Sequence, residues 1–351
     1  MIPEQPVESK KGEVEFRRLL IKQQVEGQTV FNDEFDSKKM EEILVERMTR
    51  TFEEVNQLRQ QGIPIAPYVE IGAERGQRSL VMENDLGVTG AAVDLSFDTL
   101  KSCDYYSRVF NKSKVPLRIC CDAEKLPFKS NSVPFVFCYE TLHHFPDPAP
   151  IVREIHRILH PGGYFFFAEE PYKKVFHLNL YKTKKIYSKD YLQIGIIRKT
   201  LDFFFAQKSF NEVNYGVIEN HDIPIKTWKR ALEIFDEKRV TLQSLRVLKT
   251  NLFEQNQYVR FILAYLFGGG ISGLCCKSGE LLEQKSSIRD LLSCPTCVDG
   301  SLKHNNQFLL CSQCGKSYPI LDGVVFLLPY DKLQVLYPEV YQMFEEGLRH
   351  S

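Results

Sequence analysis

The sequence predicts an α/β protein: a doubly wound, Rossmann-like sheet of seven strands followed by a small C-terminal module. Five apolar strands alternate with helices between residues 68 and 168, which is the pattern of a parallel sheet covered by helices on both faces. A glycine turn follows the first strand, where α/β folds bring backbone N–H groups close to a ligand. Two C-x-x-C pairs between residues 294 and 314 mark the C-terminal module.

Size and charge narrow the classes of function. The 351 residues fit about two domains. The 45 basic and 45 acidic residues balance, which argues against broad electrostatic wrapping of nucleic acid but leaves room for a local basic face. Residues 1–11 lack the apolar run of a signal peptide, so we expect a cytoplasmic protein.

One apolar segment raises the question of a membrane span. Tyr258–Cys276 is about long enough to cross a bilayer. It contains Arg260 and the triplet Gly268-Gly269-Gly270, which are unfavourable in a single spanning helix. We therefore expect no membrane span, and instead a buried helix, a glycine turn and a core strand.

The remaining elements follow from periodicity and from helix-ending residues. Residues 1–36 are expected to form a loosely packed leader with a short helix over residues 13–25. An amphipathic helix is expected to begin at Ser37 and to end before Gly62, with one apolar face formed by Met40, Leu44, Met48, Phe52, Val55 and Leu58. The strands are expected at Tyr68–Ile71, Gly90–Asp94, Leu117–Cys121, Val133–Tyr139, Tyr164–Ala168, Val240–Lys249 and Ile271–Lys277. The helices between them are expected at Gln77–Asn84, from Ser96, at Pro150–His160 (ended by Pro161-Gly162-Gly163) and at Ile225–Phe235.

The glycine turn and the strand ends carry the candidate ligand-binding residues. A dinucleotide fingerprint needs glycine at positions 72, 74 and 77, whereas the chain has Gly72, Glu74 and Gln77. That class of site is excluded. Asp94 follows Glu70 by 24 positions, close to the spacing at which a carboxylate takes ribose hydroxyls; capping of the next helix is the alternative. Asp122 similarly ends the third strand, or caps a short turn.

Taken together, these residues resemble a known family. The Glu70-x-Gly72-x-x-x-Gly76 turn, the two aspartates and the passages 141–145 and 159–163 are similar to class I S-adenosylmethionine (SAM) methyltransferases of the ubiquinone/menaquinone-methyltransferase-like group. The resemblance covers residues 37–278, with a substrate-covering insert at 172–235, and departs from the family at Glu74, where glycine is usual. It implies SAM as the cofactor, bound by Glu70, Gly72, Ala73, Gly76, Asp94, Leu95, Asp122, Ala123 and Tyr139. Within the insert, residues 172–199 mix basic and aromatic side chains, which either grip phosphate and stack on a ring or form a solvated helix face.

The same resemblance suggests where chemistry occurs. SAM is already an activated donor, so a base is needed only when the acceptor must lose a proton. Family position places Tyr139 and Glu140 nearest the transferred methyl group, with His143 and His144 just beyond. An imidazole can accept a proton near neutral pH, so His143, His144 and Glu140 are the candidate catalytic residues. Packing of the loop is the alternative role for both histidines.

The C-terminal cysteines predict a structural zinc site. Cys294, Cys297, Cys311 and Cys314 supply four thiolates, which fill a tetrahedral Zn²⁺ site and leave no position for catalytic water. A degenerate site or a redox pair is the alternative. Residues 288–330 resemble the zinc-ribbon family that includes the activator subunit of tRNA, rRNA and release-factor methyltransferases. This resemblance implies built-in activation or substrate docking, and residues 331–351 are expected to form a helix packed on one of the domains.

Three functions fit the sequence. The first is methyl transfer from SAM to a small molecule or biosynthetic intermediate, and the second is methylation of rRNA or tRNA. The third is a non-catalytic SAM-fold protein that binds a protein partner through its zinc module, a possibility that Glu74 keeps open. A basic surface continuous with the zinc ribbon would favour the second function, and absence of SAM binding would favour the third.

Overall fold

The computed structural model describes residues 6–25, 37–175, 180–183, 195–208, 215–244, 248–254, 258–281, 286–298, 300–305 and 307–349. The basic and aromatic stretch from Tyr172 to Lys199 lies mostly outside these residues. Its role in gripping phosphate therefore stays a prediction.

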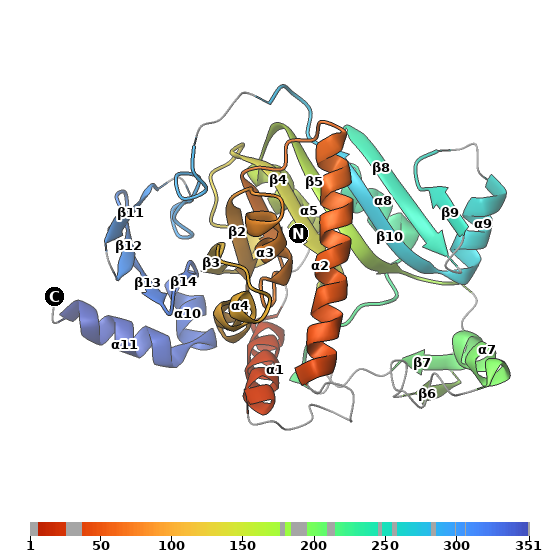
Figure 1. Ribbon diagram of the computed structural model, residues 1–351, viewed down its shortest axis with the longest axis horizontal. Helices are drawn as coiled ribbons and strands as arrows, with labels where there is room; N and C mark the ends of the chain where they lie inside the picture. Colours follow the sequence, from red (N-terminus) through yellow and green to blue (C-terminus); the bar gives the residue numbers. More distant parts are fainter. Residues whose placement is uncertain are drawn as a thin grey trace.

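One large mixed sheet runs through the protein (Figure 1). In the described part of the chain it has 12 strands in the order β11-β12-β13-β14-β3-β2-β1-β4-β5-β10-β8-β9. The central seven, β3 to β8, are the predicted sheet; β1 to β5 are parallel and β10 is antiparallel to both β5 and β8. The predicted number of seven strands is thus wrong, because five further strands extend the sheet at its two edges. Each edge strand offers unpaired N–H and C=O groups, and β9 and β14 pair with these at the two edges.

The bounds of the strands agree with the prediction near the centre of the sheet and differ toward the edges. The strands of the main sheet before the cysteine module are β1 (Tyr68–Ile71), β2 (Gly90–Asp94), β3 (Leu117–Cys120), β4 (Val133–Tyr139), β5 (Leu159–Tyr172), β8 (Glu237–Ser244), β9 (Leu248–Asn251) and β10 (Gly269–Cys276). Strand β5 is longer than predicted. Pro161-Gly162-Gly163 belong to it, because pairing with β4 continues past a register irregularity between Val133 and Phe135. The strand expected at Val240–Lys249 is interrupted and forms parts of β8 and β9.

Helices cover both faces of the sheet, as the alternation of strands and helices predicts. One face packs against α5 (Ala149–Ile158) and α8 (Ile225–Leu232), which buries Trp228. The other face packs against α2 (Ser37–Gln60), α3 (Gln77–Asn84) and α4 (Phe97–Val109), where Tyr68 and Phe137 meet Val55. Short 3₁₀ turns η1 (Ala123–Lys125) and η2 (Leu142–His144) follow β3 and β4. The small pair β6 (Tyr181–Thr183) and β7 (Ala206–Lys208) lies with α7 (Ile196–Phe205) away from the main sheet (Figure 1).

The N-terminal segment differs from the expected loosely packed leader. Helix α1 covers Val7–Val25 and packs beside α4. Its Lys10, Val14 and Phe16 are buried, so this segment belongs to the folded protein. On α2, Leu44, Met48, Val55 and Leu58 are buried as predicted. The prediction that Phe52 is buried is wrong, since 39% of this residue is exposed. The face of α2 that covers the sheet is narrower than the sequence suggests.

The apolar segment after residue 257 forms helix α9 (Tyr258–Phe267), a turn at Gly268 and strand β10, as expected. The helix is not buried, however: Ala264 is its only buried residue in the described chain, and Tyr258 is 72% exposed. The helix packs on β8 and β9 at the edge of the sheet, and Lys229 on α8 lies over its Phe261 ring. No helix in the described part of the chain is both long and apolar enough to cross a membrane.

The C-terminal module is joined to the main sheet by backbone pairing. It contains β11 (Leu302–Asn305), β12 (Phe308–Cys311), β13 (Ser317–Leu321) and β14 (Val324–Phe326), and then α10 (Tyr330–Leu336) and α11 (Pro338–Arg349). Strand β14 pairs in parallel with β3. Leu333, Leu336 and Tyr337 pack into one core with Phe97 and Cys120. The predicted C-terminal helix is therefore two helices, and it packs on the first domain.

Candidate cofactor pocket and zinc site

A pocket lies at the carboxyl ends of β1 to β4, where the glycine turn and the acidic strand ends meet. It encloses about 920 Å³, part of it open to solvent. Its walls include many of the predicted site residues, namely Gly72, Asp94, Leu95, Asp122, Ala123, Tyr139, Glu140 and His144. Outside the pocket walls lie Glu70, Ala73, Gly76 and His143. The strand ends gather these side chains because parallel strands direct their carboxyl ends to one edge.

The glycine turn is shaped by close contacts beneath it. Gly72 has φ 68°, and a Cβ there would lie 2.3 Å from the Thr141 hydroxyl oxygen. Gly76, also at φ 68°, would bring a Cβ within 2.8 Å of the Cys103 sulfur. Both positions therefore need glycine for backbone conformation and for space. Gly76 does not line the pocket; it packs against Cys103 on the side of the turn away from the pocket.

Glu70 is not among the residues that line the pocket, so its predicted role as a cofactor ligand stays a prediction. The side chain is buried and accepts a 2.5 Å hydrogen bond from the Ser79 hydroxyl on α3. Burial raises the pKa of Glu70 to about 8, although Ser79 and the Arg78 charge act in the opposite direction. Glu70 thus ties β1 to α3 and holds the turn in place.

Asp94 is prepared to accept further hydrogen bonds. Its two oxygens receive the backbone N–H groups of Ser96 and Glu74, each at 2.8 Å. The side chain of Ser96, not that of Asp94, caps α4 by accepting from Thr99 N–H. Burial raises the pKa of Asp94 to about 6, and the two N–H groups limit that rise. Each carboxylate oxygen retains a lone pair toward the pocket, which fits the two hydroxyls of a ribose.

Asp122 is held by two lysines that the sequence did not single out. Its Oδ1 accepts from Glu124 N–H, which confirms the predicted turn-capping role. Its Oδ2 lies 2.6 Å from Lys10 Nζ on α1 and 2.5 Å from Lys332 Nζ on α10. Burial would raise the pKa of Asp122, but the two lysine charges outweigh it and lower the pKa. The proposed contact with adenine stays a prediction and would have to share this carboxylate.

Glu74, the residue that replaces the usual glycine, lines the pocket and carries a salt-bridge network. It adopts φ 46°, in the left-handed region that is unfavourable for a side chain. Its carboxylate lies 2.8 Å from Arg47 on α2 and 3.5 Å from Arg17 on α1. Burial would raise the pKa of Glu74, but these arginines hold it well below its ordinary range. Arg47 also contacts Glu140 at 2.9 Å.

These arginines are functional candidates that sequence reasoning missed. Arg17, Arg47 and Arg78 all line the pocket. Arg78 stacks over the Tyr139 ring at 3.9 Å, and the Tyr139 hydroxyl donates to Glu54 at 2.8 Å. Arg47 could have been identified from the sequence as a residue on the polar face of the amphipathic helix α2. Arg17 had no such signal, because residues 1–36 were expected to be a loosely packed leader and not part of the pocket.

The loop after β4 separates the two candidate histidines. His143 is buried, with Nδ1 2.9 Å from Glu170 and Nε2 3.4 Å from Glu219. Burial would lower the pKa of His143, but these two carboxylates raise it to about 10. His143 is not among the residues that line the pocket, and its predicted catalytic role stays a prediction. Glu170 also accepts the N–H groups of residues 141 to 143 and so holds the loop.

His144 and Glu140 are the two candidate catalytic residues that reach the pocket. His144 Nδ1 lies 3.1 Å from the Ile218 carbonyl oxygen and 3.3 Å from Glu219. Glu140 adopts φ 48°, a strained conformation of the kind found at functional sites. Their catalytic roles stay predictions, although their positions permit contact with a bound acceptor.

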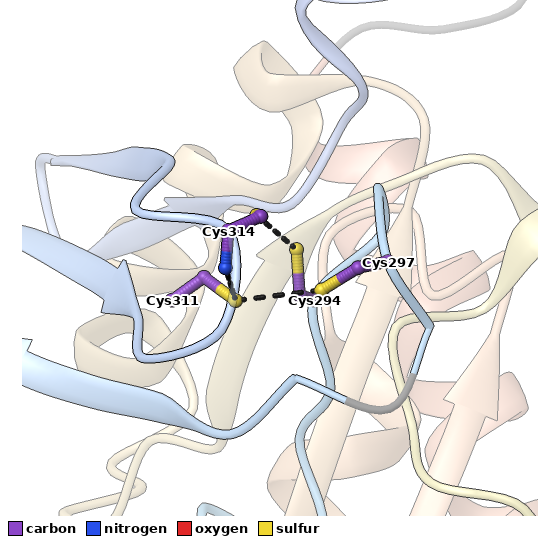
Figure 2. Close-up of side chains that lie close together, drawn as sticks. All are labelled: Cys294, Cys297, Cys311 and Cys314. Carbon is purple, nitrogen blue, oxygen red and sulfur yellow. Dashed lines mark hydrogen bonds between the residues drawn. The ribbon is translucent and has the colours of Figure 1, made fainter.

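The four predicted zinc ligands form one cluster (Figure 2). Their sulfur atoms come close in pairs: Cys294 and Cys314 at 3.7 Å, Cys297 and Cys311 at 3.5 Å. A tetrahedral site with Zn–S bonds of about 2.3 Å requires neighbouring sulfurs about 3.8 Å apart. Gly300 lies against the cluster, where a Cβ would approach the Cys311 sulfur to 2.4 Å. The cysteines are free thiols, and their arrangement fits a closed Zn²⁺ site.

Comparison with known proteins defines the class. Residues 69–167 match a protein family described as a methyltransferase domain. This stretch contains the glycine turn, Asp94, Asp122 and the histidine loop, and it leads into the strand order described above. This matched part of the fold, with the strand ends that line the pocket, is thus similar to a methyltransferase domain. The match does not extend to the cysteine module.

Individual relatives are similar over short stretches. An uncharacterized chloroplastic methyltransferase of Arabidopsis thaliana is 37% identical over 90 residues, covering 24% of this chain and 25% of that protein. The 27-O-demethylrifamycin SV methyltransferase of Amycolatopsis mediterranei is 31% identical over 102 residues, covering 27% and 35%. The chain thus spans about a quarter to a third of the length of these relatives. The crystal structure of the [4+2]-cyclase SpnF aligns with a TM-score of 0.44 at 14% identity, over 80% of this chain and 99% of that one.

Proposed function

We propose that the protein transfers a methyl group from SAM to an oxygen of a small molecule or biosynthetic intermediate. The observation that carries the proposal is the pocket itself. It places Asp94, with free acceptor capacity on both oxygens, beside the glycine turn within a matched methyltransferase domain. Among the relatives, one acts on a demethylrifamycin and another is a malonyl-[acyl-carrier protein] O-methyltransferase. Both names indicate oxygen acceptors on metabolites.

The chain's own residues bind and orient the reactants. SAM supplies a methyl group on a positively charged sulfur, which is already activated for displacement. Asp94 would accept the ribose hydroxyls, and Leu95 and Ala123 would flank the adenine. The arginines on α1 and α2 close the pocket above the glycine turn, which excludes water and aligns donor and acceptor. His144 and Glu140 reach the pocket at the end of β4, where they would contact the acceptor.

The C-terminal module would stabilise the cofactor pocket in the same chain. Its helix α10 places Lys332 on Asp122, and Tyr337 bonds the segment that follows Asp94. The Tyr337 hydroxyl accepts from Phe97 N–H at 2.9 Å and donates to the Leu95 carbonyl at 2.7 Å. Two strand ends of the pocket are therefore fixed by residues beyond the cysteine cluster. This favours built-in activation over substrate docking as the role of the zinc module. The cytoplasmic location of the protein remains an expectation.

A labelling experiment tests the proposal. Purified protein is incubated with radiolabelled SAM and a metabolite extract or total RNA, in parallel with an Asp94→Ala variant. We expect label in a small-molecule fraction with the wild type and none with the variant. Label in RNA would replace our first choice by an RNA methyltransferase. No SAM binding by calorimetry would leave a non-catalytic protein that binds partners.

A further inference from the structure

We propose that a second metal site, separate from the cysteine cluster, lies beside the pocket and binds a divalent transition-metal ion such as Zn²⁺. Its ligands are His143 and His144 of η2, together with Glu219 from the segment that precedes α8, and His221 lies beside Glu219. The two segments are fastened together by the backbone, since Asn220 N–H donates to the His143 carbonyl at 2.9 Å. The donor set is thus built by the fold from two distant parts of the chain.

The distances within the cluster are those between ligands of one ion. His221 Nε2 lies 3.1 Å from the Glu219 carboxylate, His144 Nδ1 3.3 Å and His143 Nε2 3.4 Å. Donor atoms of a tetrahedral site with metal bonds of about 2.0 to 2.1 Å lie about 3.3 Å apart. The ligand atoms of His143, His144 and Glu219 all lie within 4.8 Å of one another. His221 is not one of these three ligands and supports the site from outside by its contact with Glu219.

A purely hydrogen-bonded cluster explains these positions less well. Charge-assisted N–H···O bonds are usually about 2.7 to 2.9 Å long, and the contacts of His143 and His144 to Glu219 are longer, at 3.4 and 3.3 Å. Hydrogen bonds of 3.1 Å join His221 to Glu219 and His144 Nδ1 to the Ile218 carbonyl oxygen. By contrast, His143 Nδ1 meets Glu170 at 2.9 Å, within the ordinary range. Three rings also crowd around Glu219, with centroids 4.5 Å apart for His143 and His144 and 5.0 Å for His143 and His221. An ion between the rings and the carboxylate would account for this spacing.

The surroundings supply the support that a metal site requires. A metal-ligating histidine almost always donates its other ring N–H to a carboxylate or carbonyl, and Glu170 accepts from His143 Nδ1 in that way. Glu170 is itself fixed by three backbone N–H groups. The orientation of His143 is therefore set before any ion binds, and the ion would displace the proton from its Nε2. A site of imidazoles and one carboxylate suits Zn²⁺ and its transition-metal neighbours better than Mg²⁺ or Ca²⁺.

The position of the site gives it a role. His144 lines the pocket together with Glu140 and Phe145, so an ion here would adjoin the space at the end of β4. An acceptor oxygen in that space could enter the ion's coordination sphere, and this point alone rests on the proposed function. Metal binding itself requires neither SAM nor methyl transfer. The two ideas can therefore fail separately.

The stoichiometry of bound zinc tests the site in the full-length protein. After dialysis against Zn²⁺ and gel filtration, we expect two zinc ions per chain by elemental mass spectrometry. A mercurial reagent that attacks thiolates should release one of them, from the cysteine cluster, and leave the second bound. With Co²⁺ in place of zinc, one of the two ions should lack the sulfur-to-metal charge-transfer absorption of thiolate sites. A single zinc that the mercurial fully releases would overturn the proposal.

Variants assign the second ion to its ligands. His144→Ala should hold one zinc, and His221→Ala should weaken the second site by about tenfold or more. His304→Ala removes an exposed histidine on β11 and should retain both ions. Two tightly bound ions in both His144→Ala and His221→Ala would contradict the assignment. The zinc count of the wild-type protein needs no substitution, so the proposal can be refuted even if a variant fails to fold. A separate SAM titration tests the proposed function.

Discussion

Among single residues, Asp94 joins two loops of the pocket. Its carboxylate receives N–H groups from the glycine turn and from the start of α4, so it fixes two loops while facing the expected ribose. Burial raises its pKa to about 6, above the value of about 3.9 for an unfolded aspartate. Ligand binding and stability should therefore depend on pH in opposite ways.

The first prediction concerns SAM affinity and pH. The ionised carboxylate accepts ribose hydroxyls, so wild-type affinity should fall as pH drops through about 6. Asp94→Asn should weaken binding at pH 7.5 by on the order of 10- to 100-fold, the value of a hydrogen bond to a charged group, and should remove the pH dependence. Calorimetry at several pH values checks this, with Asp98→Asn on α4 as the control. Equal affinity in Asp94→Asn would contradict the ribose role.

The same carboxylate makes a second, opposite contribution to folding. Because its pKa is higher in the folded state, the folded protein binds more protons between about pH 4 and 6. The associated stability is fully present below about pH 4 and is lost as pH rises through 6. Asp94→Asn should remove this component from the pH profile of the unfolding free energy in the absence of ligand. An unchanged difference between pH 4.5 and 7 would show that another group is responsible.

Glu74 shows which residues could be predicted and which could not. Its place in the glycine turn identified it as the departure from the family, but its partners Arg17 and Arg47 lie far away in sequence. The same holds for Lys10 and Lys332, which meet on Asp122 from opposite ends of the chain. Periodicity identifies faces and strand ends, whereas long-range ion pairs depend on how elements are placed. For this reason the central strands and Asp94 were predicted, and the closing network was not.

At the scale of elements, α1 is held over the pocket by charges. Glu74→Gly should relieve a left-handed conformation worth about 1 to 2 kcal/mol, while losing ion pairs worth about 0 to 1 kcal/mol each at partly exposed positions. Overall stability should therefore change by no more than about 1 kcal/mol, but α1 should exchange its backbone hydrogens faster. Hydrogen-exchange mass spectrometry measures both effects.

Glu74→Gln is the matched control, because it loses the charge but keeps the strained backbone. It should be less stable than Glu74→Gly and should show a similar rise in α1 exchange. Protection of α1 equal to wild type in both variants would show that packing by Val14 and Phe16 holds the helix, not the ion pairs.

The junction between α10 and α11 offers a test of the activating role. Tyr337 is fully buried, and its hydroxyl is the partner of both Phe97 N–H and the Leu95 carbonyl. Tyr337→Phe leaves these buried groups unpaired, which costs about 1 to 3 kcal/mol. We expect lower thermal stability and weaker SAM binding, because residues 95–97 directly follow Asp94. Tyr341→Phe, on the next turn of α11, should have little effect on either measurement.

At the scale of the whole molecule, the cysteine module and the first domain should unfold together. Removing zinc ligands through a Cys297→Ser/Cys314→Ser double variant should abolish the ribbon's metal and lower the melting temperature by several degrees. The effect should reach SAM binding, because β14 continues the main sheet and α10 contacts Asp122. Calorimetry should show one transition, with Ser312→Ala as the control. Unchanged SAM affinity would restrict the module to a separate role.

The extent of the sheet was the main feature that the sequence could not provide. The first domain was indicated by a glycine turn with acidic strand ends, and the C-terminal module by two cysteine pairs. Nothing in the pattern of β3 or β14 states that these two strands pair, because backbone hydrogen bonds between strands carry little sequence information beyond alternation. The exposed helix α9 is a related case, since an apolar run alone does not distinguish a buried helix from one at an edge.

The pairing of β14 with β3 also bears on the activating role proposed for the cysteine module. A strand flanked on both sides has no free backbone groups for strand addition by another chain, and here β3 lies between β2 and β14. An activator tethered in the same polypeptide is present at high effective concentration and in a fixed one-to-one ratio. Its supply cannot rise or fall independently of the enzyme, nor can it be shared among competing partners.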